Sequence, residues 1–541
     1  MKTNTKGSAD LGQSVIKGSL ILVIANLLVK VIGAMFKIPL TNLIGNRGMG
    51  YFSSAYTIYS GLFTVATAGL PVAIAKMIAE STQRKSLREL KRIHYISYII
   101  FAIVGVVGAS ILYLGADKFM KQYGDNSICI RLIAPALFFV AIMSVYRGFF
   151  QGLSDMYPTA ISELIESSVK LIAGYSLAYI FLKKGLVYGA AGGVSGVTLG
   201  SVLGSAFLIM AFFIKRKKIY SSLDPNIPSP SRLKIFTQLM YVALPVTISA
   251  SVFTITNLID VFQTGRRLTL IADKLPLAPV DLYGMYTSKA VTMLNLPPAL
   301  VVALCLPLVP AIARAYTAKD MPSVSYKTYE SIKFTIIFAL PCSVGLALLA
   351  DPVLRTLYGT NDAATLLRLI SPAIVFVSLV LVTNAILQAT GNVLIPVLNI
   401  AIAGITKVII NYFLLVIPAI NINGVAIGSS VCYFIYMVLN LFYVSKVTKT
   451  HFSMRDFIAK PLVSSAAMGV VVLVVNRLLT SALGTSRLAA IICTGASVCA
   501  GGIIYMISLF KTSTLTKDEL IMLPKGDKII SIAAKIRLIK E

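Results

Sequence analysis

The sequence predicts an all-α integral membrane protein with fourteen transmembrane helices. Of its 541 residues, 57% are hydrophobic and only 13% are charged, and the mean hydropathy is +0.83. Soluble domains carry about 25% charged residues, so this chain is too apolar to be a set of soluble domains. Apolar runs long enough to cross about 30 Å of hydrocarbon recur along nearly its whole length. Continuous runs indicate helices, because a membrane β-barrel alternates apolar and polar residues.

The predicted helices follow one another in order, with short polar connections between them. The first run is long, contains lysines and lacks a small-residue cleavage site, so we expect a retained helix and no cleavable signal peptide. The fourteen expected spans are Ser19–Ile44, Tyr51–Ile78, Ile93–Leu114, Ile128–Phe150, Pro158–Leu182, Ala190–Ile214, Phe236–Phe262, Leu282–Ala313, Ile332–Leu349, Leu366–Ala389, Leu394–Val416, Val425–Val444, Leu462–Leu479 and Ala489–Leu509.

Lysine and arginine are distributed unevenly between the connections. They are concentrated at the two ends of the chain and in the even-numbered connections, such as the KRKK run at Lys215–Lys218. Short connections rich in these residues remain in the cytoplasm. We therefore expect a multi-pass protein of the bacterial cytoplasmic membrane with both termini inside. The net charge of +28 is then expected to meet anionic membrane lipids, and no nucleic acid.

Two segments in different halves of the chain are related in sequence. RLIAPALFFVAIMSVYRGFFQ (131–151) aligns without a gap with RLISPAIVFVSLVLVTNAILQ (368–388), sharing the first arginine, the proline and the final glutamine. AIAK at 73–76 likewise corresponds to AIAR at 311–314. Such self-similarity indicates a duplication. Each copy holds six predicted helices, an even number, so the copies are expected to have parallel topology around an axis along the membrane normal.

The duplication predicts two pseudo-symmetric six-helix lobes and accessory segments. Two bundles that face one another leave a cavity between them, which is an architecture for alternating access. We expect the protein to act as a monomer. The expected parts are an N-terminal lobe at 1–218, a cytoplasmic linker at 219–235, a C-terminal lobe at 236–445, accessory helices at 446–510 and a basic cytoplasmic tail at 511–541.

Three lysines inside predicted helices are the first candidate functional residues. A charge at the bilayer centre costs roughly 2.5 to 3.5 kcal/mol on insertion scales, so such residues usually face a cavity. Lys30 and Lys37 are seven residues apart and lie on one face of the first helix. Lys289 is the corresponding cation of the second lobe. Snorkelling to the interface is the alternative for Lys37 and Lys289, and it fits mid-helix Lys30 less well.

The fifth predicted helix carries three more charges. Glu166 and Lys170 are four residues apart and can neutralise one another, and Glu163 lies one turn earlier. We interpret this group as an ion pair inside the lobe. Lys407 occupies the position of Lys170 in the second copy.

Two further residues are candidates for a gate or for ion coupling. Arg147 lies at the cytoplasmic end of the fourth helix, and its repeat partner is Asn384. It acts either as a gate or as a cap on the last helix carbonyls. Asp260 lies near the outer end of the seventh helix. It either binds a coupling cation or caps Arg266 and Arg267.

Several chemistries are excluded by what the sequence lacks. The six cysteines lie in apolar segments without a CxxC spacing, and there are only two histidines, so neither disulfides nor a metal site is expected. No GxxxxGK[ST] motif occurs, so we expect no ATP hydrolysis. No cofactor is predicted, and transport would instead draw on an ion gradient or the membrane potential.

Two long segments carry a family resemblance. GSLILVIANLLVKVIGAMFKIPLTNLIGNRGMGYFSSAYTIYSGLFTVATAGLPVAIAKMIAE (18–80) and YRGFFQGLSDMYPTAISELIESSVKLI (146–172) resemble the stage V sporulation protein B branch of the polysaccharide biosynthesis transporters. These are relatives of the MurJ-type lipid II flippases in the multidrug/oligosaccharidyl-lipid/polysaccharide exporter superfamily. The resemblance covers essentially the whole chain.

The resemblance implies a fourteen-helix flippase with two lobes. Such a protein moves an undecaprenyl-pyrophosphate-linked sugar from the inner to the outer leaflet, and its last two helices hold the prenyl chain. In lipid II flippases, cavity arginines of helices 1, 2 and 8 serve the pyrophosphate. Lys30 matches one of those in helix 1, and Lys37 and Lys289 match others approximately. Here lysine, a point charge, replaces the bidentate fork of arginine.

The sequence therefore predicts a flippase for a lipid-linked sugar precursor, with the lysines as counter-charge for the pyrophosphate. The chain is not expected to be an enzyme. A drug/cation antiporter of the same superfamily is the first alternative, although it would favour an acidic, aromatic cavity. A membrane enzyme that transfers or polymerises lipid-linked sugars is the second. Its catalytic carboxylates or metal site would be expected on a sizeable loop, and the longest outer loop, at 263–281, has no clustered acids or histidines.

Overall fold

The computed structural model describes residues 5–123, 127–305, 308–453, 455–484, 486–512 and 514, and these residues are almost entirely helical. In that part of the chain the only β-type pairing is an isolated bridge between Ser86 and Asp224. The predicted all-α class is confirmed. Most of the predicted basic tail, from 515 onward, lies outside the described residues.

Each predicted span falls on helix in the structure. Ten of the described helices are long and apolar enough to cross a membrane, or eleven if the bent pair of α13 and α14 is one span. The chain is therefore a multi-pass membrane protein, while the number fourteen stays a prediction. The α-helices are α1 (Thr5–Thr67), α2 (Leu70–Gln83), α3 (Leu87–Met120), α4 (Ile128–Gly152), α5 (Tyr157–Leu182), α6 (Leu186–Ser221), α7 (Arg232–Thr269), α8 (Pro279–Met285), α9 (Val291–Cys305), α10 (Leu308–Thr317), α11 (Met321–Leu348), α12 (Ala350–Tyr358), α13 (Ala364–Ile370), α14 (Ala373–Ala389), α15 (Leu394–Leu414), α16 (Asn423–Thr448), α17 (Lys460–Leu483) and α18 (Arg487–Lys511).

The first two predicted spans run together as α1, with a break in helical geometry at Gly45. Gly45 has φ 63° and ψ −175°, a conformation that costs glycine little and other residues much. The second predicted span reaches Ile78, but the helix ends at Thr67 and resumes as α2, with Pro71 in its first turn. Proline is favoured there because its missing N–H needs no partner in the first turn of a helix.

The chain forms two compact units. Unit 1 comprises residues 1–288 and 408–425, and unit 2 comprises residues 289–407 and 426–541. The lobe boundaries expected from the duplication stay a prediction.

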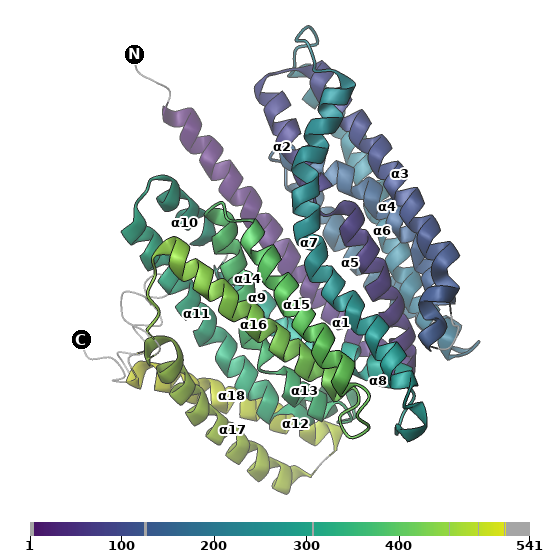
Figure 1. Cartoon of the computed structure of the whole chain (residues 1–541), viewed down its shortest axis with the longest axis vertical. Helices are drawn as coiled ribbons and strands as arrows, with labels where there is room; N and C mark the ends of the chain where they lie inside the picture. Colours follow the sequence, from purple (N-terminus) through teal and green to yellow (C-terminus); the bar gives the residue numbers. More distant parts are fainter. Residues whose placement is uncertain are drawn as a thin grey trace. The chain divides into compact units, whose positions relative to one another are not determined.

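Unit 1 has an aromatic core formed by α2, α3, α4 and α6. Figure 1 shows α3, α4 and α6 lying side by side, and these helices contact one another extensively. His94 of α3 stacks on Phe212 of α6, with ring centroids 4.7 Å apart, and meets Phe149 of α4 edge to face. Burial of such large rings dominates the energetics of a core. This packing fixes α4 beside α6, and α5 packs along α6.

Unit 2 is held together around α11. Phe334 and Ile337 of α11 pack with Met468 of α17 and Leu509 of α18 in one buried cluster. The hydroxyl of Tyr505 on α18 donates to the Ile337 carbonyl over 2.7 Å. The two accessory helices α17 and α18 are therefore docked on α11 along their apolar faces.

Both copies of the repeat contain the same ion pair at the start of the aligned segment. Arg131 of α4 binds Asp117 at the end of α3 over 2.8 Å. Arg368 of α13 binds Asp351 of α12 in the same way. The arginine shared by the two aligned segments thus joins an aspartate of the preceding helix in each unit, which is consistent with a duplicated scaffold.

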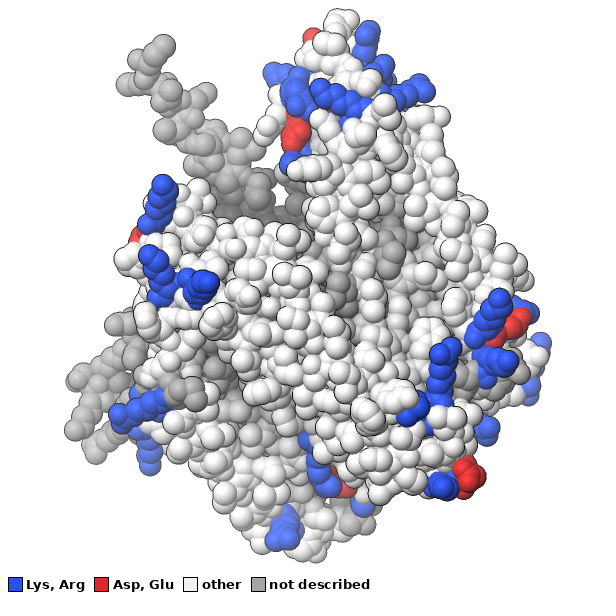
Figure 2. All heavy atoms as spheres, in the orientation of Figure 1, with Lys and Arg blue, Asp and Glu red and all other residues white. Residues whose placement is uncertain are grey.

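Charged side chains are segregated from the long apolar surfaces of the helices. Figure 2 shows lysine and arginine gathered near helix ends, for example near the ends of α2, α3 and α7 of unit 1, with white surface along the helices. An apolar band between charged ends is the distribution that a bilayer requires.

Candidate functional site

The face of α1 that carries Lys30 and Lys37 is the first part of the candidate site. Lys30 is exposed and Lys37 is half-buried. The Lys37 ammonium lies 3.5 Å from the carbonyl oxygen of Thr287. Among the described residues, no carboxylate forms an ion pair with either lysine. Two full charges on one helix face therefore lack an acidic partner in the described part of unit 1.

The carbonyl that Lys37 contacts belongs to an irregular turn. Residues 286–290 form a π-helical turn, and the Thr287 hydroxyl donates to the Tyr283 carbonyl over 2.9 Å. Such turns displace carbonyls from the regular α pattern and are frequent at functional sites. Gly284, one turn earlier, has no room for a Cβ because the Asn46 carbonyl oxygen of α1 lies against it. This close approach of α8 to α1 brings Thr287 within reach of Lys37.

Lys170 of α5 adds a third cation to this region. Its ammonium lies 4.6 Å from the ring centroid of Tyr56 and 5.3 Å from that of Phe36, both on α1. It is also near enough to Lys37 to repel it electrostatically. Aromatic faces attract cations without neutralising them. We call Lys30, Lys37 and Lys170 the α1–α5 cationic cluster.

The expected pair between Glu166 and Lys170 is not the one that forms. Glu166 accepts instead from the guanidinium of Arg147 on α4 over 3.0 Å, and Arg147 Nε donates to Ser162 over 3.1 Å. The guanidinium of α4 satisfies the carboxylate while Lys170 turns toward the rings of α1. The alternative in which Arg147 caps helix carbonyls is also not observed, since its described contacts are side chains of α5. Glu163 has one buried carboxylate oxygen with no partner in the described part of the chain.

The second copy replaces this charged group with amides. Asn384, the repeat partner of Arg147, accepts from Asn440 over 2.7 Å and from the Tyr436 hydroxyl over 3.0 Å. Asn440 in turn accepts from Asn399 over 2.8 Å. A neutral network therefore holds α14, α15 and α16 together where an ion pair joins α4 to α5. Lys407, at the position of Lys170, is buried in unit 2.

Asp260 is buried near the end of α7. Its carboxylate accepts from Asn411 of α15 over 3.0 Å. Arg267 does not cap it, because this arginine donates to the Tyr412 carbonyl over 2.9 Å and stacks over the Tyr412 ring. Of the two explanations expected for Asp260, an ion pair with Arg266 or Arg267 is not found among the described residues, and cation coupling stays a prediction.

Lys289 in unit 2 has an acidic partner that the sequence did not indicate. Its ammonium lies 2.5 Å from the carboxylate of Asp362 and donates to the Thr360 hydroxyl over 2.9 Å. The Lys289 side chain is only 4% exposed, against 32% for Asp362. In this conformation its charge is neutralised, unlike those of Lys30 and Lys37.

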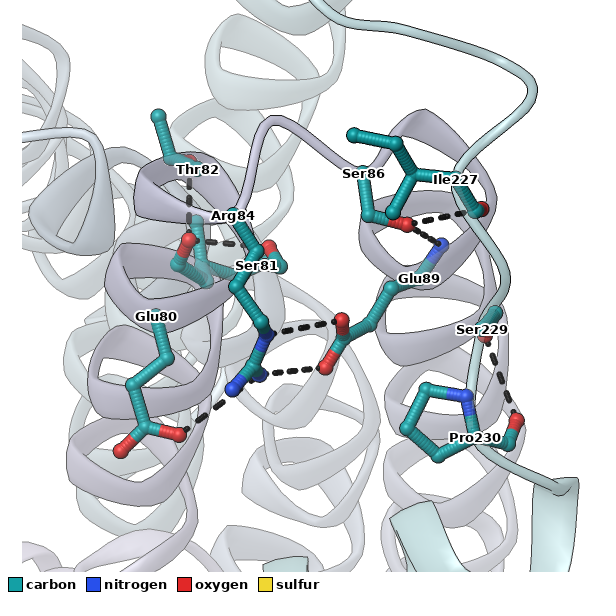
Figure 3. A network of polar contacts seen from close by, with 10 residues as sticks. Glu80, Ser81, Thr82, Arg84, Ser86, Glu89, Ile227, Ser229 and Pro230 are labelled. Carbon is teal, nitrogen blue, oxygen red and sulfur yellow. Dashed lines mark hydrogen bonds and ion pairs between the residues drawn. The ribbon is translucent and has the colours of Figure 1, made fainter.

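The connection between α2 and α3 is hydrogen-bonded to the predicted linker. Figure 3 shows Arg84 between Glu80 and Glu89. The Arg84 guanidinium lies 3.8 Å from the Glu80 carboxylate and 2.6 Å from that of Glu89. The Ser86 hydroxyl donates to the Ile227 carbonyl. Leu87 N–H donates to the Asp224 carbonyl over 3.1 Å, and Asp224 N–H donates to the Lys85 carbonyl over 2.8 Å. Arg92 of α3 adds a bond to the Pro230 carbonyl over 2.9 Å. The segment at 224–230 is therefore bound to α3 and to the α2–α3 connection at several points.

The fold and the intramembrane charges define a multi-pass membrane transporter. Residues 15–316, more than half of the chain, match the family described as polysaccharide biosynthesis protein, and residues 287–413 match the family described as MatE. The chain belongs to the polysaccharide biosynthesis protein family of the multidrug/oligosaccharidyl-lipid/polysaccharide exporter superfamily. The resemblance seen in the sequence is confirmed.

Relatives of known name cover almost the whole chain. It is 27% identical over 530 residues to stage V sporulation protein B of Bacillus subtilis (strain 168), covering 96% of this chain and 99% of that protein. It is 25% identical over 538 residues to lipid II flippase MurJ of the same strain, covering 94% and 97%.

Solved structures of the superfamily share the fold. Lipid II flippase MurJ in an inward closed conformation superposes with a TM-score of 0.69 at 16% identity, covering 90% of this chain and 97% of that one. An inward-facing multidrug resistance MATE transporter gives 0.64 at 18% identity, covering 80% and 100%. At these identities the likeness concerns the fold alone.

Proposed function

We propose that this protein is a flippase that moves an undecaprenyl-pyrophosphate-linked sugar precursor from the inner to the outer leaflet by alternating access. The observation that carries the proposal is the α1–α5 cationic cluster. Lys30 and Lys37 have no carboxylate partner among the described residues, and Lys170 rests on aromatic rings. A pyrophosphate is an expensive anion inside a membrane, and these ammonium groups replace its hydration with charge-assisted contacts.

The order of the lysines along α1 suggests a path for the anion. If the N-terminus is cytoplasmic, Lys30 is the first lysine within the first predicted span reached from that side. Lys37 follows two helical turns later, about 10 Å further along the helix. The carbonyl of Thr287 holds Lys37 only weakly, at 3.5 Å. A phosphate oxygen would compete effectively with that contact, because charge-assisted bonds are roughly twice as strong as neutral ones.

Lys289 is also proposed to bind the substrate, but only in a conformation in which its present contacts are broken. Its ammonium is bound to Asp362 and Thr360 in this structure. A substrate contact therefore requires this pair to open during transport. Energy for the cycle would come from an ion gradient or the membrane potential, and Asp260 is a candidate for the coupling group.

Conditional depletion tests the proposal. Lipids extracted from depleted cells should contain an excess of one undecaprenyl-pyrophosphate-linked sugar, identified by mass spectrometry, and right-side-out vesicles should show that it is inaccessible from outside. A normal level of every lipid-linked sugar in depleted cells would contradict a flippase function.

A drug/cation antiporter is the second candidate function. The match of residues 287–413 to the MatE family and the MATE-like fold favour it. The cationic cluster disfavours it, because cationic drugs would be repelled. Efflux of a toxic fluorescent cation from cells that express the protein would support the antiporter, and the same cells would then show no change in lipid-linked sugars.

A further inference from the structure

One cavity of the molecule lies wholly within unit 2 and is separate from the cationic cluster. It has a volume of about 420 Å³ and is bounded by α11, α14, α16 and the chain that leads into α17. This volume is in the range of small-ligand sites, about 300 to 1,000 Å³. Apart from two serines, every lining residue is apolar.

The cavity offers an occupant few hydrogen-bonding groups, because two serines are its only polar lining residues. Of its two serines, Ser343 donates to the Ser371 carbonyl over 2.9 Å and is satisfied. The walls include four phenylalanine rings, among them Phe376 and Phe434, whose centroids are 5.3 Å apart. Cavities lined in this way do not hold water. Phe434 and Leu462 are 47% and 49% exposed, so the cavity opens on the surface of unit 2. Its occupant must be apolar.

The dimensions of the cavity fit one acyl chain of one leaflet. On α11 the lining runs from Ile332 to Ser343. At a rise of 1.5 Å per residue this is about 16 Å. Half of a hydrocarbon core of about 30 Å is about 15 Å. A polyprenyl chain is much longer than the cavity and would extend beyond it.

Basic residues flank the chain that borders one side of the cavity. Phe452, Ser453, Phe457 and Ile458 of this chain line the cavity. Exposed lysines, a histidine and an arginine alternate with these rings, namely Lys446, Lys449, His451 and Arg455. Exposed basic residues beside an apolar cavity match an anionic lipid headgroup.

The backbone beside these lining residues is held in a defined conformation. Thr450 is buried, and its carbonyl accepts from Ser445 over 2.7 Å. Lys449 has φ 53°, a left-handed conformation that is uncommon for lysine. Such conformations persist only where the surroundings impose them. The loop is thus built to present Lys449 and His451 outward from a fixed backbone.

We propose that this cavity is a specific binding site for an anionic phospholipid, with one acyl chain between α11, α14 and α16 and the phosphate at Lys449 and Arg455. The proposal does not depend on which substrate the protein transports.

Lipid retention by the full-length protein tests the site. The detergent-purified protein is incubated with equal amounts of dioleoyl phosphatidylglycerol and dioleoyl phosphatidylcholine, and the bound lipid is measured by native mass spectrometry. The expected result is one phosphatidylglycerol retained in preference. Lys449→Asn removes the charge and suits the left-handed backbone, and Arg455→Gln removes the second charge. Each should lower phosphatidylglycerol retention about fivefold, because a basic residue near a membrane surface contributes about 1 kcal/mol.

Two further variants complete the test. Lys217→Asn with Lys218→Asn removes two exposed charges from unit 1 and should leave retention unchanged. Val375→Phe fills the cavity and should lower retention of both lipids. Equal retention of the two lipids by the wild type would show ordinary boundary lipid only. Absence of any retained lipid would show that the cavity is not a lipid site in the purified protein. Either result, or unchanged retention in the Lys449 and Arg455 variants, would overturn the proposal.

Discussion

Arg147 of α4 and Glu166 of α5 form an ion pair of 3.0 Å between two neighbouring helices of unit 1, where the side chains are 17% and 27% exposed. At the repeat-related position, Asn384 forms a neutral network with Asn440 and Tyr436. The shared scaffold can therefore be held by amides. The charge in unit 1 is a departure from the scaffold, and asymmetry within a duplication suggests a role in one unit alone.

Arg147→Asn, which copies the second unit, should destabilise the protein and separate the two roles. The variant leaves Glu166 without its charged partner, and hydrogen bonds to charged groups contribute about 1.5 to 3 kcal/mol. Thermal unfolding in detergent should show the loss. Arg147→Asn with Glu166→Gln should recover most of the stability, because neither charge then remains unpaired. If transport by this double variant is normal, the pair is structural. Lost transport at recovered stability would support a gate.

The sequence predicted the helices better than their junctions. Long apolar runs determine where helices lie, and each predicted span is helical in the structure. The break at Gly45 and the π turn at 286–290 lie beside the close approach of Gly284 to Asn46, a contact between α8 and α1 that hydropathy does not indicate. The single predicted span at 282–313 is therefore divided into shorter helices, and its residues 306 and 307 lie outside the described part.

The sequence predicted relationships between candidate residues only where those residues lie on one helix. The common face of Lys30 and Lys37 follows from their spacing, whereas Lys289 pairs with Asp362 from 73 residues away. Glu166 likewise prefers Arg147, 19 residues away, to the nearby Lys170. A helix-face rule compares only residues of one helix, so it cannot weigh a partner on another. The preference of Lys170 for the rings of Tyr56 and Phe36 was missed for the same reason.

Asp362→Asn should destabilise unit 2 more than the loss of one partner from an exposed ion pair would. The Lys289 side chain is 4% exposed, so the substitution leaves a buried ammonium whose remaining described contacts are the Thr360 hydroxyl and the Tyr358 ring. Removing one partner of a buried pair lowers the free energy of unfolding by about 3 to 5 kcal/mol. Because Asp362 is partly exposed, we expect a loss near the lower value. Chemical unfolding would measure it.

Lys289→Met with Asp362→Asn removes both charges and should restore stability, since an apolar replacement of a buried pair is often neutral. Transport then decides the role of Lys289. A stable double variant that transports normally would remove Lys289 from the proposed substrate contacts. A stable variant that fails to complement a depleted strain would support its role.

The hydrogen bonds made by residues 224–230 should protect this segment from proteolysis. Arg92→Ala removes the bonds to the Ser229 and Pro230 carbonyls. An exposed bond of this kind contributes about 1 kcal/mol, so cleavage by proteinase K should become about fivefold faster. Arg88→Ala, four residues earlier on α3 and also exposed, is the matched control. Equal cleavage of both variants and the wild type would show that Arg92 does not restrain the segment.

The lysines of α1 should act together on one dianionic group. With an effective dielectric near 20, an ammonium at 4 Å from a phosphate charge contributes up to about 4 kcal/mol before desolvation, far more than the roughly 0 to 1 kcal/mol of a surface pair. Lys30→Ala or Lys37→Ala should therefore abolish complementation of a flippase-depleted strain at normal membrane levels. Lys217→Ala, which removes an exposed charge from a connection, should complement fully.

Charge and position can then be separated on the same two residues. Lys37→Arg should keep partial activity, because the charge remains and only its geometry changes. Lys37→Glu should be worse than alanine, because it repels the phosphate. Residues that bind one group are not additive, so the double alanine variant should be no worse than the poorer single variant. Normal growth of both single alanine variants at normal expression would mean that Lys30 and Lys37 are structural. The anion would then have to be bound by other cations, and Lys170, which is near enough to Lys37 to repel it, would be tested next.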